Sequence, residues 1–507
     1  MWLLLALAAG PAMAGQPGPP PAQQTPPMEN ETLLRPVVLP GADRKPRLPS
    51  RPDAPTRLTL AEAINRALVA NRNLANSQDN LESARLGIVV AESDFELKIY
   101  PQAGVSFNAA NSDDGASTYA LGFKLEKKIS YGTRASVAPV VSLSGDTYKS
   151  GLDMRLTQPL FRGTSPEFNL SSLHGAQYYD RTARRSFYLN QVSTVVETVA
   201  GVYEVIRQRE LLRLNEDAAR RLNGFTQAAM AKEKAGLATP IDVFRASIQL
   251  KQAEDSLTNA RESFQDAADN LKVLLALRQE ESILLEAPLS YQSLRLAEDK
   301  AVELALERRV ELEQASDAVS ETQRLSRVAK HGTLPELNLS LGYQRFSTGD
   351  NINDSFLFDR DSRGLSLVTS SDLNRSAENA NFQRSLLNVQ AATRNREDRR
   401  DDVIRQVRRE LRSLRRGQER IANQQEQIRQ AEGQLELAQV KFQHGLTDNF
   451  TLLEAENRLR QAQTTLLSLV VDYIVGTYRL RAALGTLVER GGPPLPKEVE
   501  NSAMVRP

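Results

Sequence analysis

The stretch KAGLATPIDVFRASIQLKQAEDSL (residues 234–257) occurs a second time, 209 residues later, as QHGLTDNFTLLEAENRLRQAQTTL (443–466). The two copies align without a gap, and each carries a Gly-Leu pair before a run of apolar and small residues. Two earlier segments, AINRALVANRNL (63–74) and AVELALERRVEL (301–312), correspond in the same way. The chain is therefore predicted to contain two structural repeats, each made of a helix, strands and a long helical hairpin with a tight turn.

Leucine and alanine recur every three or four residues after each Gly-Leu pair, which is the spacing of a helix with one apolar face. The first such seam runs from Leu250 to Leu274 and the second from Leu459 to Leu487. No proline interrupts residues 167–233 or 381–443, which precede the two turns. At ~1.5 Å per residue, helices of this length reach on the order of 90–100 Å. Such helices are suited to a bundle or a tube rather than to a compact globule.

Strand candidates lie between the helices. They are residues 102–109, 117–129, 133–144, 151–160, 336–346 and 363–369. In the second of them Leu121, Phe123 and Leu125 alternate with smaller or polar residues. Most are close to the roughly 9–11 residues that cross a bilayer in a tilted strand. A soluble sheet would show the same weak alternation, but the very long helices on either side favour strands in a membrane.

Composition excludes several classes of function. Lys+Arg 64 and Asp+Glu 63 leave a formal net charge of +1, whereas nucleic-acid-binding domains are usually strongly basic, so we expect no nucleic-acid partner. The absence of cysteine removes zinc-thiolate sites and thiol nucleophiles. His174, His331 and His444 are far apart in sequence. We find no phosphate-binding loop and no nucleophile elbow, and we expect no enzyme activity, no metal site and no cofactor.

An arginine-rich segment, residues 394–420, is interleaved with acidic residues. It could bind phosphate groups, but a solvated helix face with pairs at i and i+4 is the favoured interpretation.

The two ends of the chain differ in composition from the rest. Residues 1–14 are interpreted as a signal peptide, because an apolar stretch is followed by Ala12-Met13-Ala14. No basic residue precedes that stretch, which leaves an apolar N-terminal tail or a longer native N-terminus as alternatives. Residues 15–57 are proline-rich and are expected to form an extended linker rather than a ligand for a partner domain. Residues 489–507 are expected to be a flexible tail.

The order of elements, the duplication, the segment LTQPLFRG (156–163) and the Gly-Leu-x-x-x-x-Asp-Val turn from Gly236 to Val243 resemble the TolC-type outer-membrane efflux protein family. The resemblance covers about residues 58–488. It implies an α+β membrane protein, a homotrimer whose strands close one outer-membrane β-barrel that is continued by a long periplasmic α-helical barrel. It also implies a location in the cell outer membrane and contacts with outer-membrane lipid, with a periplasmic adaptor (membrane fusion) protein and with an inner-membrane pump.

The repeats are not equal in length. The first is placed at residues 58–290, with strands within 101–160 and a hairpin tip near 236–242. The second is placed at 291–488, with strands within 336–373 and a tip near 445–451. The offset between them falls from 238 to 209 along the chain, and we expect the extra residues of the first repeat to form an additional hairpin around Gly132. Ser371-Asp372-Leu373 replaces the Gln158-Pro159-Leu160 of the first repeat, so that strand end is expected to be irregular.

The resemblance also indicates where function should concentrate. A periplasmic gate is expected at Asp242, Thr451 and Glu454, with Thr451 in place of one of the family's aspartates. The tyrosine and arginine that would latch Asp242 correspond to Phe442 and Thr447, so that latch is largely missing. A purely local role for Asp242 and Glu454, as acids near a helix N-terminus, has about equal weight. The adaptor-docking tip is expected at four positions: Gly236, Leu237, Gly445 and Leu446.

The predicted function is the exit duct of a tripartite efflux or type I secretion system. A soluble periplasmic coiled-coil scaffold would explain the heptads but would leave the duplicated strands and the export signal unexplained. A plain outer-membrane porin would leave the long helices unexplained. Small-molecule efflux ranks ahead of metal efflux and protein secretion only because it is the family's commonest use.

Overall fold

The computed structural model describes residues 56–108, 116–291, 293, 296–372, 374–444, 446–447 and 449–488. They belong to one compact unit, Ala54–Pro507. The expected signal peptide, nearly all of the expected linker and the expected C-terminal tail lie outside the described residues, as do Leu373 and Gly445. Regular structure starts at Thr56, two residues inside the expected linker, because residues 56–59 pair as a strand.

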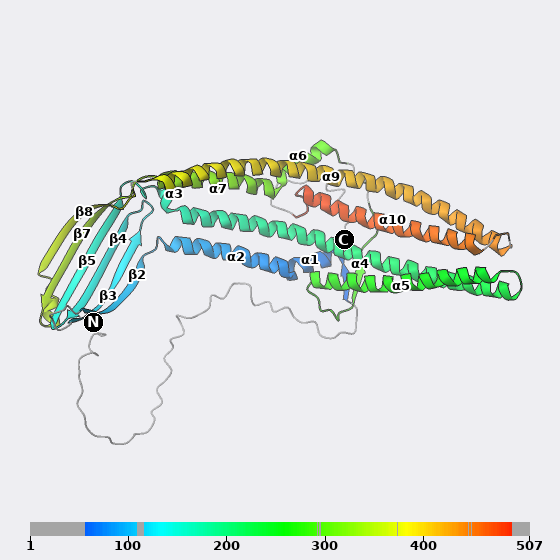
Figure 1. Cartoon of the computed structure of the whole chain (residues 1–507), viewed down its shortest axis with the longest axis horizontal. Coiled ribbons are helices and arrows are strands. Elements are labelled where there is room, and N and C mark those ends of the chain that lie inside the picture. Colours follow the sequence, from blue (N-terminus) through cyan, green and yellow to red (C-terminus); the bar gives the residue numbers. More distant parts are fainter. Residues whose placement is uncertain are drawn as a thin grey trace, which may run out of the picture. The chain divides into compact units, whose positions relative to one another are not determined.

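Six of the strands form one antiparallel sheet, in the order β2-β3-β4-β5-β7-β8 (Figure 1). Their bounds are β2 Lys98–Asn108, β3 Ala116–Lys128, β4 Arg134–Ser144, β5 Thr147–Pro159, β7 Leu337–Gly349 and β8 Arg360–Thr369. All six strand candidates are therefore confirmed. Four strands come from the first repeat and two from the second, and β2 and β8 are the two edges of the sheet.

The additional hairpin expected around Gly132 is the turn between β3 and β4. The Ile129 N–H donates to the Thr133 carbonyl at 2.9 Å, and Gly132 has φ +82°. A Cβ atom at Gly132 would lie 2.2 Å from the Gly163 carbonyl oxygen, so only glycine fits this turn.

The segment LTQPLFRG leads from β5 into the helices through a turn at Gly163, which has φ +95°. The Gly163 N–H donates to Nε2 of His331 at 3.0 Å, and Asn169 Nδ2 donates to the Gly163 carbonyl at 2.6 Å. Burial, together with the nearby Arg162, lowers the pKa of His331 below its ordinary value. In the second repeat β8 ends at Thr369, and the Ser371 hydroxyl accepts a hydrogen bond from the Glu336 N–H. The two strand ends are thus built differently.

The helices account for most of the rest of the described chain. Their bounds are α1 Leu60–Ala70, α2 Arg72–Ser93, α3 Pro166–Asn169, α4 Ser171–Lys234, α5 Pro240–Leu274, α6 Glu298–Arg308, α7 Val310–Gly332, α8 Ile352–Ser355, α9 Ser376–Gln443 and α10 Asn449–Ala483. Helices α4 and α9 have 64 and 68 residues, which confirms the long helices expected from the proline-free stretches. Both lead away from the sheet, and α5 and α10 return alongside them (Figure 1).

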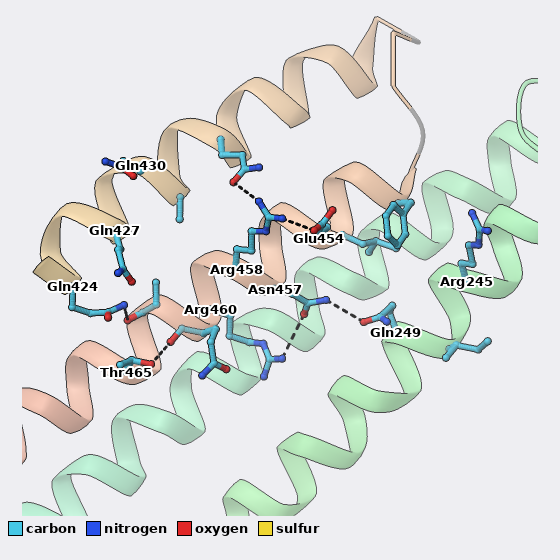
Figure 2. A pocket seen from close by; sticks show the side chains of 17 residues that line it. Arg245, Gln249, Gln424, Gln427, Gln430, Glu454, Asn457, Arg458, Arg460 and Thr465 are labelled. Carbon is cyan, nitrogen blue, oxygen red and sulfur yellow. Dashed lines mark hydrogen bonds and ion pairs between the residues drawn. The ribbon is translucent and has the colours of Figure 1, made fainter. Parts of the chain in front are cut away.

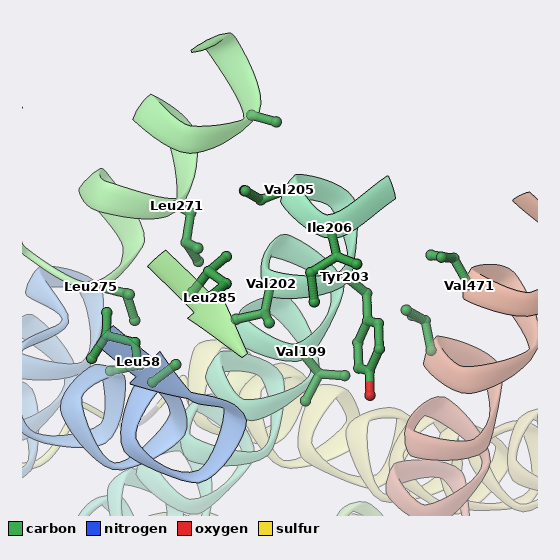
Figure 3. Close-up of a cluster of buried hydrophobic side chains, with 14 of the residues drawn as sticks. Leu58, Val199, Val202, Tyr203, Val205, Ile206, Leu271, Leu275, Leu285 and Val471 are labelled. Atoms are coloured by element: carbon green, nitrogen blue, oxygen red, sulfur yellow. The ribbon is translucent and has the colours of Figure 1, made fainter. Parts of the chain in front are cut away.

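The two repeats meet in a core midway along α4. Val199, Val202 and Ile206 are almost fully buried against Leu271 of α5 and Val471 of α10 (Figure 3). The short parallel pair β1 (Thr56–Thr59) and β6 (Ile283–Glu286) covers the same core. Tyr203 lies within it and donates its hydroxyl to the Pro288 carbonyl at 3.2 Å, and burial raises the pKa of this hydroxyl to about 12. The predicted heptad seams therefore form contacts between helices.

Within the part of the chain that the structure describes, no helix combines the length and the apolar character needed to cross a bilayer.

The outward face of β3 gives a test of lipid contact. Leu121 and Phe123 are exposed on the same face, and an arginine at a lipid-facing position near mid-bilayer costs ~2–4 kcal/mol. We expect Phe123→Arg to reduce the amount of assembled protein in outer membranes, measured by fractionation and immunoblotting. Phe123→Leu is the matched control. Equal yields of the two variants would show that this face does not meet lipid.

The strand-to-helix junction should depend on pH. His331 accepts a hydrogen bond only while Nε2 is unprotonated, and its pKa is lowered in the folded protein. The stabilisation that this hydrogen bond gives to the fold is therefore complete above the ordinary histidine pKa of ~6.5. It is lost as the pH falls through the lowered pKa of His331 in the folded protein. We expect the protection of the Gly163 amide, relative to its intrinsic exchange rate at each pH, to fall in excess on acidification, and His331→Gln to remove that excess. His444→Gln, at an exposed position, is the control, and the same excess in His331→Gln would contradict the assignment.

Candidate functional site at the hairpin tips

The first hairpin tip joins α4 to α5 through the Gly-Leu pair. The Gly236 N–H donates to the Glu233 carbonyl and the Leu237 N–H to the Lys232 carbonyl, each at 2.8 Å. Gly236 has φ +71°. These are the two bonds and the left-handed residue of a helix C-terminal motif that favours glycine. The motif ends α4 and leaves the Leu237 side chain 77% exposed.

The second tip follows the same design as far as it is described. The Leu446 N–H donates to the Lys441 carbonyl at 2.8 Å, as Leu237 does to Lys232. Leu446 is 76% exposed. Gly445 lies outside the described residues. Each hairpin therefore presents a solvent-facing leucine at its end.

Asp242 is held at the start of α5. Its Oδ2 accepts from the Thr239 N–H at 3.1 Å and from the Thr239 hydroxyl at 2.7 Å. These bonds, the side-chain one first, hold the pKa of Asp242 below its usual value. The local role as an acid at a helix start is therefore present in the structure, and it leaves the carboxylate charged over a wide pH range.

Thr451 and Glu454 lie in the first turns of α10, and both are exposed. Glu454 Oε1 is 2.6 Å from Arg458 Nη2, one turn along the same helix, and Arg458 Nη1 donates to Gln434 of α9 at 3.3 Å (Figure 2). Within one chain each of the two expected gate carboxylates contacts a residue of its own helix or helix cap: Asp242 contacts Thr239 and Glu454 contacts Arg458. A ring of these carboxylates would need further copies of the chain.

Lys232 makes a cross-hairpin contact where the family's latch is missing. Its Nζ donates to the Phe442 carbonyl at 3.1 Å and lies 3.6 Å from the centroid of the Phe442 ring. The contact links α4 to α9, so Phe442 still joins the hairpins, with a lysine cation as its partner. The sequence singles out Phe442 but not Lys232, because no local pattern pairs a lysine in one repeat with an aromatic residue in the other.

A second missed contact lies further from the tips. Arg221 of α4 forms an ion pair with Glu456 of α10. Glu456 is only 1% exposed, and its Oε2 has no hydrogen-bond partner among the described residues. Removing Arg221 would leave a buried carboxylate uncompensated, which is costly. This pair therefore fixes how the two hairpins pack.

A hollow of about 860 Å³ lies between α5, α9 and α10 near the tips. Glutamines such as Gln249 and Gln424 line it beside the charged Glu454 and Arg458 and beside apolar side chains, and Asn457 of α10 donates to Gln249 of α5 at 3.3 Å (Figure 2). The hollow therefore offers polar, charged and apolar contacts together. Among the described residues no cluster of three or more metal-ligating side chains is present.

Comparison with known proteins agrees with this architecture. The sequence matches the family described as Outer membrane efflux protein over residues 63–277 and 301–486. No curated protein sequence gives a match. The fold is similar to that of VceC from Vibrio cholerae, with a TM-score of 0.66 and 16% identity over 84% of this chain and 96% of that one. The CmeC channel of Campylobacter jejuni gives 0.65 and 14% over 87% and 88%.

The MtrE channel of Neisseria gonorrhoeae, in its open state, is similar to the same degree, with a TM-score of 0.65 and 16% identity over 84% of this chain and 89% of that one. At such low identity these structures support the fold alone. The family match shows more than the fold, because its two segments cover more than half of the chain and include helices and strands of both repeats. The chain belongs to the outer membrane efflux protein family.

Proposed function

We propose that this chain is the exit duct of a tripartite efflux or type I secretion system. Three copies would close one barrel in the outer membrane, and their helices would form a periplasmic tunnel. Substrates would pass from a pump or the periplasm to the exterior, with an adaptor docked at the hairpin tips. Small molecules are the favoured cargo class.

The observation that carries the proposal is the open sheet. Strands β2 and β8 are edges without a partner strand in the described sheet. Every residue of β8 is exposed, including Leu365 and Leu367, and Phe107 on β2 is 68% exposed. A sheet can reside in lipid only when its edges are paired, since unpaired backbone groups are very costly there. Further copies of the chain would supply the missing neighbours.

Cell fractionation tests the function class. The duct should sediment with outer membranes, require detergent for extraction and migrate as a trimer on a gel when unheated. A coiled-coil scaffold would remain in the soluble periplasmic fraction. A porin would reach the membrane but would not need an adaptor for transport. Recovery of the full chain as a soluble monomer would refute the proposal.

The exposed leucines at the tips are the proposed adaptor contact. Replacing Leu237 and Leu446 together by Asp places charge where an apolar contact with an adaptor helix is expected. We expect a folded trimer that no longer supports efflux and no longer crosslinks to the adaptor.

The control for this pair is Val69→Asp, an exposed valine on α1 (89%) away from the tips. It should leave adaptor crosslinking intact. If the double variant crosslinks to the adaptor as well as the control does, the docking surface lies elsewhere.

Glu454 is the proposed selectivity residue of the gate. In a trimer, three copies would bias a narrow pore toward cations, and each is partly offset by its Arg458. In planar bilayers we expect Glu454→Gln to lower cation selectivity and weaken block by trivalent cations from the periplasmic side. Arg458→Gln should shift selectivity in the opposite direction.

Asp242 and Glu254 provide the comparison. Asp242→Asn should have a smaller effect, because Thr239 already holds that carboxylate at a helix start. Glu254→Gln removes an exposed acid that is paired with Lys251 on α5, and it should change nothing. Unchanged selectivity and block in Glu454→Gln would place the constriction elsewhere.

A further inference from the structure

Helices α5 and α9 each have one face that no other described residues cover. Helix α5 packs on α4 through residues such as Ala260, Ala267 and Leu271. Helix α9 packs on α6 and α10 through Val403, Val407, Leu411 and Leu414. The residues on the opposite faces are exposed.

The uncovered face of α9 is basic. Arg405, Arg409, Arg412 and Arg416 follow one another at i, i+4, i+7 and i+11, which places them on one side of the helix. All four are exposed. Arg405 pairs with Asp402 and Arg409 contacts Glu410. Arg412 and Arg416 have no ion pair with any described residue of their own chain.

The uncovered face of α5 is acidic. Glu262, Asp266 and Asp269 follow at i, i+4 and i+7, and all three are exposed. Asp269 pairs with Lys272 in its own helix. Glu262 and Asp266 have no partner among the described residues. The two open faces of the unit therefore carry opposite charge.

The charged faces also lie at the same level along the helices. The contacts Lys232–Phe442 and Gln249–Asn457 hold the two hairpins level within one chain. Arg412 lies 33 residues before Gly445 in sequence, and Asp269 lies 33 residues after Gly236. Arg416 and Asp266 lie 29 and 30 residues from the same two glycines.

Near the tips, α9 and α5 each carry an exposed apolar residue at the same distance in sequence from the turn glycine. Leu437 on α9 lies 8 residues before Gly445, and Phe244 on α5 lies 8 residues after Gly236. They are 54% and 66% exposed. Copies related by a rotation axis along the helices stay level with one another, so both matches would be made together.

We propose that α9 of one copy packs against α5 of the next, with Arg412 facing Asp269 and Arg416 facing Asp266. The inference rests on the proposed trimer and names the surface that builds its helical part. The contact joins two different faces, so it is heterologous, and it closes into a ring when the rotation between copies is that of the proposed trimer. It agrees with the sheet, where β8 leads into α9 and β2 follows α2 at the other edge. Complementary charge would fix both the register and the direction of packing.

Crosslinking in this cysteine-free chain tests the surface. We expect Arg416→Cys combined with Asp266→Cys to give covalent dimers and trimers with a short bis-maleimide reagent, on denaturing gels of detergent-extracted protein. The matched control is Arg408→Cys with Asp266→Cys, because Arg408 faces Glu298 of α6 at 2.8 Å. The control should remain mostly monomeric after denaturation.

Charge exchange gives an independent readout. Arg412→Glu with Arg416→Glu should lower the temperature at which the unheated trimer dissociates, and so should Asp266→Arg with Asp269→Arg. The four changes together should restore the dissociation temperature, because the ion pairs between copies are then formed again with the charges exchanged. The loss in each double variant should also shrink at high salt, which screens exposed charges.

Two outcomes would overturn the proposal in distinguishable ways. An intact trimer in which Arg416→Cys with Asp266→Cys crosslinks no better than the control, and in which exchange restores nothing, would reject this surface alone. A parent chain that is monomeric in outer membranes would reject the proposed trimer as well.

Discussion

The open edges of the six-stranded sheet are the constraint on which the rest of the structure depends. A row of backbone donors and acceptors on β2 and another on β8 have no neighbour in the sheet, and such groups must be paired wherever water is excluded. The two edge strands are continuous in sequence with helices, because α2 precedes β2 and α9 follows β8. A neighbour that pairs with an edge strand therefore also lies beside one of these helices. Whatever closes the sheet must therefore also bring the outer faces of the helices together. One packing problem connects the membrane part to the tunnel part.

The two hairpins must be held level for that closure to work along their full length. Three kinds of contact do this: the apolar core around Ile206, the buried pair Arg221–Glu456 and the Lys232–Phe442 contact at the tip. The core provides most of the stabilisation, since apolar burial scales with area. The buried ion pair adds register rather than much net stability, because its desolvation offsets its attraction. The tip contact is the most exposed of the three and the easiest to break.

Much of this could be predicted from the sequence, and the limit has a physical origin. The glycine at 236, the proline-free run before it and the heptads after it are local signals, and the structure follows them closely. The extra hairpin was predictable because the length difference between repeats had to be placed somewhere, and Gly132 marked the turn. The partners of Glu456 and Phe442 were not predictable. They depend on how helices from different repeats face each other, and a heptad pattern does not encode which helix is the neighbour. The partner of Asp242 was within reach of the sequence, because Thr239 and Asp242 have the spacing of a capping box at the start of α5.

The tips combine two requirements that favour different residues. The proposed docking turn needs exposed apolar side chains, and Leu237 and Leu446 are both solvent-exposed beside helix ends closed by backbone hydrogen bonds. The proposed constriction needs charge: Asp242 stays charged because Thr239 donates to it, whereas the charge of Glu454 is offset by Arg458 within each chain. The Arg458 pair is exposed, and such pairs contribute only about 0–1 kcal/mol, so assembly or an approaching ion can redistribute it at little cost. The Thr239 bonds are part of the helix start, so a change in them would also loosen the first turn of α5. The second repeat therefore carries the more adjustable charge, while the first repeat carries the more rigid turn.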